Sequence, residues 1–422
     1  MTDTIFALSS GSPPAAIAVV RISGPSARSA IETLGGAVPP PRRAVLRTLR
    51  GANGDVVDQA LILWFPGPAT ATGEDCAELH CHGGRAVVAA VRAALSRLPG
   101  LREAEPGEFT RRAFANGRID LAQAEALGDL LAAETELQRR VAQAGVSGGL
   151  SSVVEGWRDR VLTLSAQVEA VLDFGDEGDV DELSERFFVQ RAGLRFEILD
   201  YLSRPRADRL RDGVRVVIAG PPNSGKSSLF NALIGDGAAI VSPLAGTTRD
   251  VIERPVAFGG VPFLLVDTAG LHEPDGEIEA IGIARAKAQI TQADIVLWLG
   301  EEGAGPTGAM EIQSRFDDPT AAQKIRPDHI VSSKTLEGLR GLESQLVERA
   351  RDLLPKAGVA AVNERQAGLL NEVTNSLADT SEDPLLLAES LRSSRESFDR
   401  LLGRSGVEDM LDALFGRFCI GK

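Results

Sequence analysis

The pattern of hydrophobic and polar positions changes three times along the chain. In the first 118 residues, short and mostly apolar runs at 16–22 and 60–65 predict strands, and 85–98 predicts a helix. A Leu- and Ala-rich helical pattern begins at Asp120, where Gln123 completes the sequence of a capping box. We therefore expect a small α+β domain followed by a largely helical segment.

A third pattern begins at Gly213. Residues 214–219 are apolar except for Arg215 and predict a buried strand, and strands and helices then alternate to about residue 354. After Pro355 the sequence becomes helical and charge-rich again. The expected fold is multidomain α/β: an N-terminal α+β domain at 1–118, an inserted α/β domain at 213–355, and a discontinuous helical domain at 119–212 plus 356–422.

Composition limits the possible functions of the chain. Its 422 residues are too many for one core, and 43% are apolar and 25% charged. Because no apolar run is long enough to span a bilayer and the first residues lack the features of a secretory signal, we expect a cytoplasmic protein without a membrane contact. The net charge of -14 means that nucleic-acid binding would need a local basic patch or a partner subunit.

The most specific motif follows the predicted strand at 214–219. Gly220-Pro-Pro-Asn-Ser-Gly-Lys-Ser227 fits the pattern in which glycines let backbone N–H groups turn toward phosphate oxygens. The helix N-terminus adds positive potential, Lys226 can reach the β- and γ-phosphates, and the Ser227 hydroxyl can ligate Mg²⁺. The expected nucleotide contacts in this segment are Asn223, Ser224, Gly225, Lys226, Ser227 and Ser228.

Three further segments follow in the order that a GTPase requires. In Gly246-Thr-Thr-Arg-Asp250 we assign the second Mg²⁺ ligand to Thr248. The glycines at 259–260 predict a hairpin, whose second strand leads into Asp267-Thr-Ala-Gly270 at the γ-phosphate. The segment at 330–334 is expected to contact guanine. The nucleotide contacts expected in these segments are Ser242, Thr247, Thr248, Asp267, Thr268, Ala269, Gly270, Ser332, Ser333 and Lys334. The inserted domain is thus expected to be a Ras-like P-loop GTPase domain.

The element that reads the base departs from the usual pattern. GTPases normally carry Asn-Lys-x-Asp after a strand, whereas Ser-Arg-Phe-Asp at 314–317 follows the predicted strand at 310–313. Asp317 could still pair with the guanine ring nitrogens and the stem of Arg315 could stack on the base, but Asp317 could also be an ordinary loop acid. The segment at 298–330 is also short for the usual helix, strand and helix. The strength of guanine selectivity therefore stays open.

The hydrolytic step also needs unusual residues. Leu271 stands where Ras-like enzymes carry a water-orienting Gln, and no Arg finger is identifiable in this chain. The candidate acids for positioning water are Glu273, Glu277 and Glu279. Asn223 is an additional oxygen donor beside the phosphates and would suit a monovalent cation.

Several of these motifs together resemble a known family. Asn223, the segment 246–250 and Asp267-Thr-Ala-Gly-Leu271 resemble the potassium-activated tRNA-modification GTPases called MnmE or TrmE. Residues 105–125 are similar to the long N-domain signature of that family, and Phe418-Cys-Ile-Gly-Lys422 is similar to its C-terminal Cys-x-Gly-Lys. The resemblance covers the whole chain except the shortened stretch near 300–329.

This resemblance implies a homodimer formed through the N-terminal domains, with a site there for a tetrahydrofolate derivative (5,10-methylene- or 5-formyl-) as one-carbon donor. It also implies that K⁺ stabilises the charge of the transition state where an Arg finger would otherwise act. The implied folate contacts are Arg21, Glu78, Arg118 and Lys422, and the implied K⁺ ligands are Asn223, Ser242, Leu244 and Thr247. Catalytic roles are expected for Lys226, Glu279 and Cys419, although Cys419 could instead be a small apolar residue packed under a helix.

The implied partner is the FAD-dependent MnmG (GidA) protein, in a heterotetramer through which tRNA is bound. Together they would add a carboxymethylaminomethyl or aminomethyl group at carbon 5 of the wobble uridine. The alternative is a regulatory or ribosome-assembly GTPase without modification chemistry. Such a protein would need a basic RNA-binding module, and the composition of residues 1–118 does not indicate one.

A cluster of cysteine and histidine residues lies in one predicted strand. Cys76, His80, Cys81 and His82 fit no standard zinc spacing. We also expect His80 and His82 to lie on alternate faces of that strand, which argues against a metal site.

Overall fold

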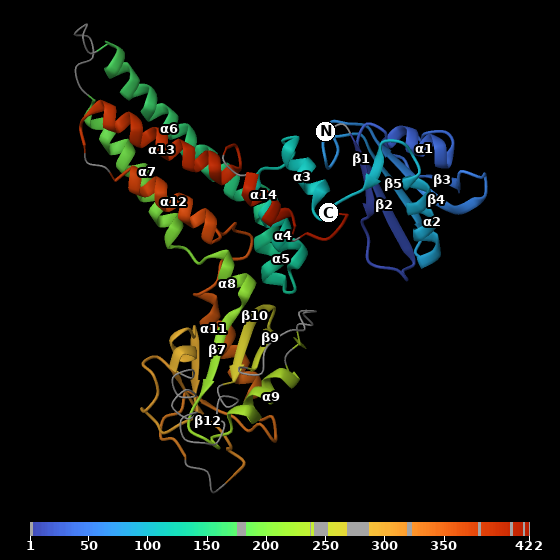
Figure 1. Cartoon of the computed structure of the whole chain (residues 1–422). Coiled ribbons are helices and arrows are strands. Elements are labelled where there is room, and N and C mark those ends of the chain that lie inside the picture. The colour runs from blue at the N-terminus through green and yellow to red at the C-terminus, as the bar shows by residue number, and fades with distance from the viewer. Residues whose placement is uncertain are drawn as a thin grey trace, which may run out of the picture. The chain divides into compact units, whose positions relative to one another are not determined.

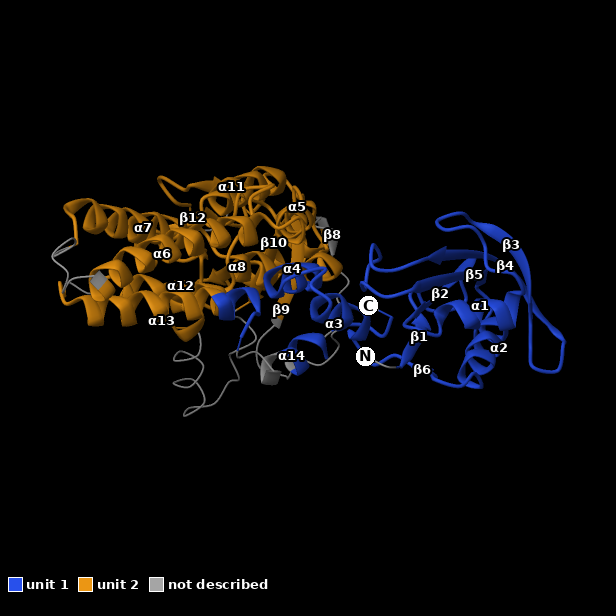
Figure 2. Ribbon diagram, turned by 90° about the horizontal axis from the view of Figure 1, so that it is seen from above, with its two compact units in different colours: residues 1–128, 399–422 blue, residues 129–398 orange. Residues whose placement is uncertain are grey.

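The computed structural model describes residues 3–174, 183–236, 238–239, 252–267, 287–318, 323–378, 381–405, 408–416 and 418–421. The chain forms two compact units, Met1–Gly128 with Asp399–Lys422 and Asp129–Phe398 (Figure 2). Both ends of the chain therefore belong to the unit that contains the N-terminal sheet. The division into three domains expected from the sequence stays a prediction.

The first unit is built on a six-stranded sheet in the order β3-β4-β5-β2-β1-β6. All neighbouring strands are antiparallel except β1 and β6. The strands are β1 (Thr4–Leu8), β2 (Ile17–Ser23), β3 (Val45–Arg50), β4 (Val56–Phe65), β5 (Cys76–His82) and β6 (Leu101–Glu103). Val20 and Ile22 pack in one core with α1 (Ala27–Gly35) and α2 (Arg85–Ser96). Because side chains alternate along a strand, Arg21 points to the opposite face.

Among the described residues, the first unit also contains α3 (Glu108–Ala115), α4 (Leu121–Ala132, as far as Gly128) and α14 (Glu408–Phe415). Phe109 of α3 packs with Ile5 and Ala7 of β1, on the face that α1 and α2 leave open. The predicted capping box before α4 is present, because the Gln123 N–H donates to Asp120 Oδ1 at 2.8 Å and the Asp120 N–H donates to Gln123 Oε1 at 3.0 Å.

The second unit contains a seven-stranded sheet in the order β13-β12-β11-β7-β10-β9-β8. Its strands are β7 (Val214–Ala219), β8 (Ala238–Ala239), β9 (Ile252–Phe258), β10 (Val261–Asp267), β11 (Ile295–Trp298), β12 (Met310–Gln313) and β13 (His329–Ile330). The strands from β13 to β10 are parallel, and the predicted hairpin at Gly259-Gly260 joins the antiparallel β9 and β10. Helices α9 (Lys226–Asp236) and α11 (Leu339–Arg351) share a core with this sheet (Figure 1).

The connection between β11 and β12 is too short for a crossover helix. Residues 299–309 are all described and contain no helix, as the sequence predicted. This connection folds over Trp298, whose ring N–H donates to Glu301 O at 2.9 Å, and a Cβ at Gly305 would meet the same ring at 2.7 Å. The Lys324 ammonium, from the next connection, donates to Trp298 O at 2.8 Å. The loop thus packs against one side of the partly exposed Trp298 ring.

The described part of the second unit also contains helices outside the sheet region. They are α5 (Glu136–Val146), α6 (Gly149–Phe174), α7 (Glu185–Ser203), α8 (Ala207–Asp212), α12 (Glu364–Ser376) and α13 (Pro384–Leu402, as far as Phe398). The helices α6, α7, α12 and α13 run side by side (Figure 1). Trp157 of α6 meets Tyr201 of α7 edge-on, with ring centroids 5.4 Å apart. Among the described helices, none has the length and apolar character needed to cross a bilayer.

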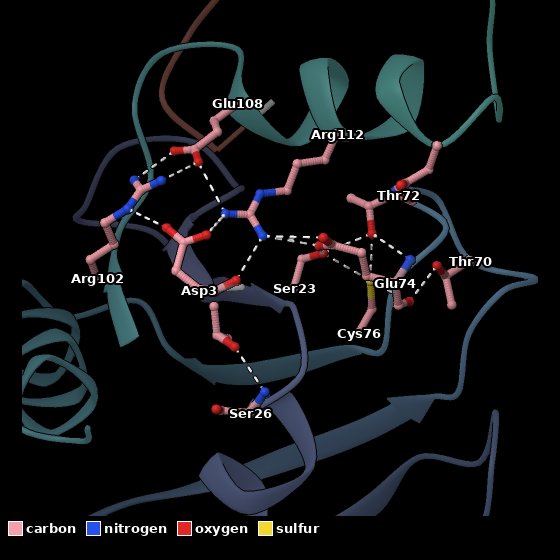
Figure 3. Close-up of polar contacts among 12 residues, drawn as sticks. Asp3, Ser23, Ser26, Thr70, Thr72, Glu74, Cys76, Arg102, Glu108 and Arg112 are labelled. Atoms are coloured by element: carbon pink, nitrogen blue, oxygen red, sulfur yellow. Dashed lines mark hydrogen bonds and ion pairs between the residues drawn. The ribbon is translucent and has the colours of Figure 1, made fainter. Parts of the chain in front are cut away.

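A buried arginine connects distant parts of the first unit (Figure 3). The Arg112 side chain on α3 is fully buried, and its guanidinium donates to Asp3 Oδ1 at 2.9 Å, Glu108 Oε1 at 3.1 Å and Glu74 Oε2 at 3.2 Å. Burial by itself would raise the pKa of Glu108. Hydrogen bonds from Arg102, from a backbone N–H and from Arg112 outweigh burial, so the pKa of Glu108 lies below its ordinary value. The carboxylate therefore stays ionised and paired.

Replacing Arg112 tests how much this network stabilises the first unit. Arg112→Met leaves three carboxylates without their shared cation, so we expect the unit to lose about 3–5 kcal/mol of stability. Hydrogen exchange of the peptides covering β1, β2 and α3 measures this loss. The control is Arg92→Met, which breaks an ion pair with Glu103 whose partners are both 47% exposed, and we expect a loss below about 1 kcal/mol. Equal losses in the two variants would contradict the prediction.

Candidate functional site

The loop between β7 and α9 has backbone angles that few side chains permit. Gly220 has φ +154 and Gly225 has φ +93, values that favour glycine. A Cβ at Gly220 would meet Ser224 Oγ at 2.9 Å. Asn223 has φ +61, a left-handed conformation in which Asn is enriched among non-glycine residues. The loop is therefore curled tightly in the way that the phosphate-binding motif predicts.

The Lys226 side chain is buried at the base of this loop. Its Nζ donates to Gly220 O at 3.0 Å and to Pro221 O at 2.8 Å. Burial lowers the pKa of Lys226, and the charge of the buried Asp267 opposes this shift. The ammonium group is thus placed beside the first turn of α9, where backbone N–H groups lack helical partners and attract anions. Ser227 and Ser228 are exposed in this turn, so the Ser227 hydroxyl is accessible for an Mg²⁺ ion.

The base-reading candidates lie together at the ends of β12 and β13. Ser332 Oγ donates to Asp317 Oδ1 at 2.6 Å. The backbone N–H groups of Lys334 and Thr335 point to the same hydroxyl, at 3.3 and 3.1 Å. The Ser332 hydroxyl thus holds the Asp317 carboxylate in position. Because Asp317 is exposed, this carboxylate is also accessible to a ligand. Its role in reading the base stays a prediction.

One contact in this region was missed by reasoning from the sequence. Ser314 Oγ donates to Ser224 O at 2.8 Å and thereby connects the base-reading segment to the phosphate loop. The only signal for it was that Ser314 stands in the place of the usual Asn. A contact between a side chain and a backbone carbonyl 90 residues away leaves no pattern in the sequence.

A cleft of about 980 Å³ borders the loop. It lies beyond the carboxyl ends of β7, β11 and β12, the edge at which open α/β sheets bind ligands. Its lining comes from residues 221–224, 299–303, 312–315 and 323–325.

Several expected site residues lie outside the described residues. They are Ser242, Leu244, Thr247, Thr248, Thr268, Ala269, Gly270, Glu279 and Lys422, together with the alternative acids Glu273 and Glu277. The expected K⁺ and Mg²⁺ ligand sets and the water-positioning acid therefore stay predictions.

The first unit brings together two of the expected folate contacts. Arg21 Nε and Nη2 donate to Glu78 Oε1 at 3.1 and 3.0 Å, on the sheet face away from α1 and α2. The Arg21 guanidinium lies 5.9 Å from the centre of the Phe109 ring. His80, which the sequence analysis did not assign to this site, approaches Glu78 Oε2 at 3.2 Å. The spacing of two residues on a strand could have predicted that His80 shares the face of Glu78.

The expectation that His80 and His82 alternate faces is wrong for the same reason, because positions two apart on a strand share a face. Their contacts nevertheless differ: His82 Nδ1 lies 2.7 Å from Asp58 Oδ1, whereas His80 contacts Glu78. In the described part of the chain, no group of three or more His, Cys, Asp or Glu residues could hold a metal ion.

Arg118 belongs to the first unit as well. A Cβ at Gly73 would meet Arg118 Cγ at 3.3 Å, which places this side chain beside the loop before β5. Among the described residues, no hydrogen bond or ion pair joins Arg118 to Arg21 or Glu78.

The C-terminal segment lies against the start of the chain. Ser9 Oγ donates to Gly421 O at 2.9 Å, and Ile420 forms a β-bridge with Pro106. Phe418 is buried, whereas Cys419 is exposed. The reading of Cys419 as a residue packed under a helix is therefore wrong, and its catalytic role stays a prediction.

Comparisons with known proteins match this chain along nearly its full length. The family model described as the GTP-binding protein TrmE N-terminus matches residues 4–118, and the MnmE helical domain matches residues 121–419. The tRNA modification GTPase MnmE of Erythrobacter litoralis is 62% identical over 423 residues, with 100% of each chain covered. That of Novosphingobium aromaticivorans is 56% identical over 437 residues, again with 100% of each chain covered. Among solved structures, the G domain of the T. maritima FeoB iron transporter matches 32% of this chain and 98% of its own, at 27% identity and a TM-score of 0.25.

The contacts of Lys226 lead us to predict that a positive charge at this position does not by itself maintain the affinity for GTP. Lys226→Arg keeps the charge, but its planar guanidinium does not fit two carbonyl acceptors around a side chain that is only 4% exposed. We expect the affinity for GTP to fall about tenfold or more, measured by titration with a fluorescent nucleotide. Lys356→Arg, at an exposed position outside the loop, is the control and should leave the affinity unchanged. Wild-type affinity in Lys226→Arg would refute this account.

Proposed function

The chain belongs to the MnmE (TrmE) family of tRNA modification GTPases, and from that membership we propose that it hydrolyses GTP in the modification of the wobble uridine of tRNA. The observation that carries the proposal is the phosphate loop, in which Lys226 is buried against Gly220 and Pro221 at the start of α9. Turnover of GTP by the purified chain tests the hydrolytic part. Analysis of the wobble uridine in tRNA from cells that lack the protein tests the modification.

The finer chemistry proposed is the addition of a carboxymethylaminomethyl or aminomethyl group at carbon 5 of that uridine. A tetrahydrofolate derivative would supply one carbon, and the FAD-dependent MnmG (GidA) protein would be the partner in a heterotetramer. The net charge of -14 supports a tRNA that is held through the complex rather than by this chain alone. A cytoplasmic location fits these partners.

The proposed ion sites are built around the phosphate loop. Mg²⁺ would be held by Ser227 and Thr248, and it would neutralise charge on the β- and γ-phosphates. K⁺ would be held by Asn223 with Ser242, Leu244 and Thr247. Asn223 lies in this loop and is exposed, which fits a ligand for a second cation. Glu279 would orient the attacking water.

The role of K⁺ can be tested without distorting the loop. Replacing K⁺ by Na⁺ should slow GTP hydrolysis strongly in the wild type. Asn223→Gly removes the side-chain oxygen but permits φ +61, so it should keep GTP affinity and lose most of the acceleration by K⁺. Asn223→Ala is the matched strain control, since it removes the same oxygen and adds about 1–2 kcal/mol of backbone strain. Rates that are equal in K⁺ and Na⁺ would remove the cation role.

The proposed folate site lies on the open face of the N-terminal sheet. Glu78 can accept hydrogen bonds from the amino edge of a pterin, and Arg21 can pair with a pterin carbonyl or a glutamate carboxylate. The buried Phe109 ring, 5.9 Å from the Arg21 guanidinium, packs beneath this face and helps to fix the position of Arg21. Arg118 and Lys422 are proposed to contribute further positive charge.

The same sheet face supports the proposed homodimer. Leu46 pairs with Leu61 across β3 and β4, and these side chains are 59% and 43% exposed. Ile17 of β2 is 58% exposed. Apolar side chains gathered on a sheet face are typical of a surface that associates with another protein.

Binding of 5-formyltetrahydrofolate to the whole chain tests the folate site. Arg21→Met removes two charge-assisted donors, and we expect it to weaken binding about tenfold in isothermal titration calorimetry. Arg28→Met, which breaks an exposed pair with Glu32 on α1, is the control and should bind normally. If the wild type binds no folate at high micromolar ligand, a GTPase without modification chemistry becomes the better account.

A further inference from the structure

Ser314 has one hydroxyl proton, which it already donates within the protein. The side chain is buried, and Oγ donates to Ser224 O at 2.8 Å. The position of Ser314 is also fixed from its own segment, because the Gln313 amide donates to Ser314 O at 3.0 Å. Gln313 in turn accepts the Lys324 N–H at 2.6 Å. This serine therefore joins the phosphate loop to the base-reading segment and has no second proton to donate.

Asp317 can read only part of a guanine. An ionised carboxylate accepts hydrogen bonds and cannot donate them, so Asp317 can pair with the N1–H and 2-amino groups of the base. Adenine is rejected by the same rule, because its N1 is an acceptor. The N7 and O6 atoms of guanine are acceptors and need a donor from the protein.

The usual Asn at the position of Ser314 would have two N–H donors as well as an acceptor oxygen, enough for a tie to the loop and a bond to N7. Serine offers a single O–H, which already points to Ser224 O. The other donor of the segment, Arg315, is exposed, and its side chain forms no hydrogen bond with the described residues. Among the described residues of this segment, neither Ser314 nor Arg315 therefore holds a side-chain donor in place for N7.

We propose that this chain recognises guanine through its N1 and 2-amino edge and leaves N7 unread. In this arrangement Asp317, held by Ser332, determines base specificity. Ser314 is a positioning residue that fixes the phosphate loop relative to that carboxylate. The inference rests on the GTP-binding function proposed above and concerns how the base is selected.

Two nucleotide analogues test this selection in the wild-type chain with Mg²⁺ and K⁺ present. In 7-deaza-GTP a CH group replaces N7, and ITP lacks the 2-amino group. We expect 7-deaza-GTP to bind within about twofold of GTP and ITP to bind about tenfold or more weakly, as competition against a fluorescent nucleotide would measure. A tenfold loss with 7-deaza-GTP would overturn the inference. Failure to bind GTP at all would instead remove the proposed function.

Variants of Ser314 separate positioning from contact with the base. Ser314→Ala should weaken GTP, 7-deaza-GTP and ITP by a common factor, because the tie to Ser224 is lost. Ser314→Thr keeps the hydroxyl and should restore all three affinities. Ser314→Asn adds donors and should create a preference of about tenfold for GTP over 7-deaza-GTP. A change in the ratio of GTP to 7-deaza-GTP in Ser314→Ala, or no new preference in Ser314→Asn, would overturn the assignment.

Discussion

A buried ammonium group organises the phosphate loop. Burying the charge of Lys226 is costly unless acceptors replace the lost water, and the loop supplies two of its own carbonyl oxygens, from Gly220 and Pro221. The backbone at Gly220 and Pro221 must therefore curl around the side chain of Lys226, which follows a few positions later. The positive φ at Gly220 belongs to this curl, and so does that at Asn223. The phosphate binding proposed at the start of α9 depends on the shape that this arrangement imposes.

The loop is also held from outside, and this second restraint follows from how the sheet is built. Ser314 comes directly after β12, and its hydroxyl reaches Ser224. This contact therefore requires that the end of β12 stays fixed relative to the end of β7. The connection from β11 to β12 has no helix to secure that position. Trp298 covered by its own loop, and Lys324 paired with Glu311 and bonded to Trp298 O, do so instead. A short connection and a fixed position of β12 are thus compatible, because a partly covered ring and a partly buried ion pair hold the strand.

Local features of this protein were predictable from the sequence because local physics determines them. The strand at 214–219, the hairpin at Gly259-Gly260 and the capping box at Asp120 each depend on residues within a few positions of one another. Boundaries were less accurate: β4 begins at Val56, whereas the apolar run indicated residue 60. The contacts that build the sites could not be predicted, because Ser314 and Ser224 are 90 positions apart and Arg112 and Asp3 are 109 apart. Neither pairing has a signature in composition or period.

The hydrogen bonds of Arg112 show how contacts between residues far apart in the sequence position a helix. Buried ion pairs add little net stability compared with apolar packing, since the desolvation of the ions offsets their attraction. Arg112 and Phe109 are three positions apart on α3 and therefore lie on the same side of that helix. By binding Asp3 at the start of the chain and Glu74 in the loop before β5, Arg112 fixes α3 against the sheet. The buried Phe109 ring is thereby held 5.9 Å from the Arg21 guanidinium, so the buried charge also helps to position Arg21 at the proposed folate site.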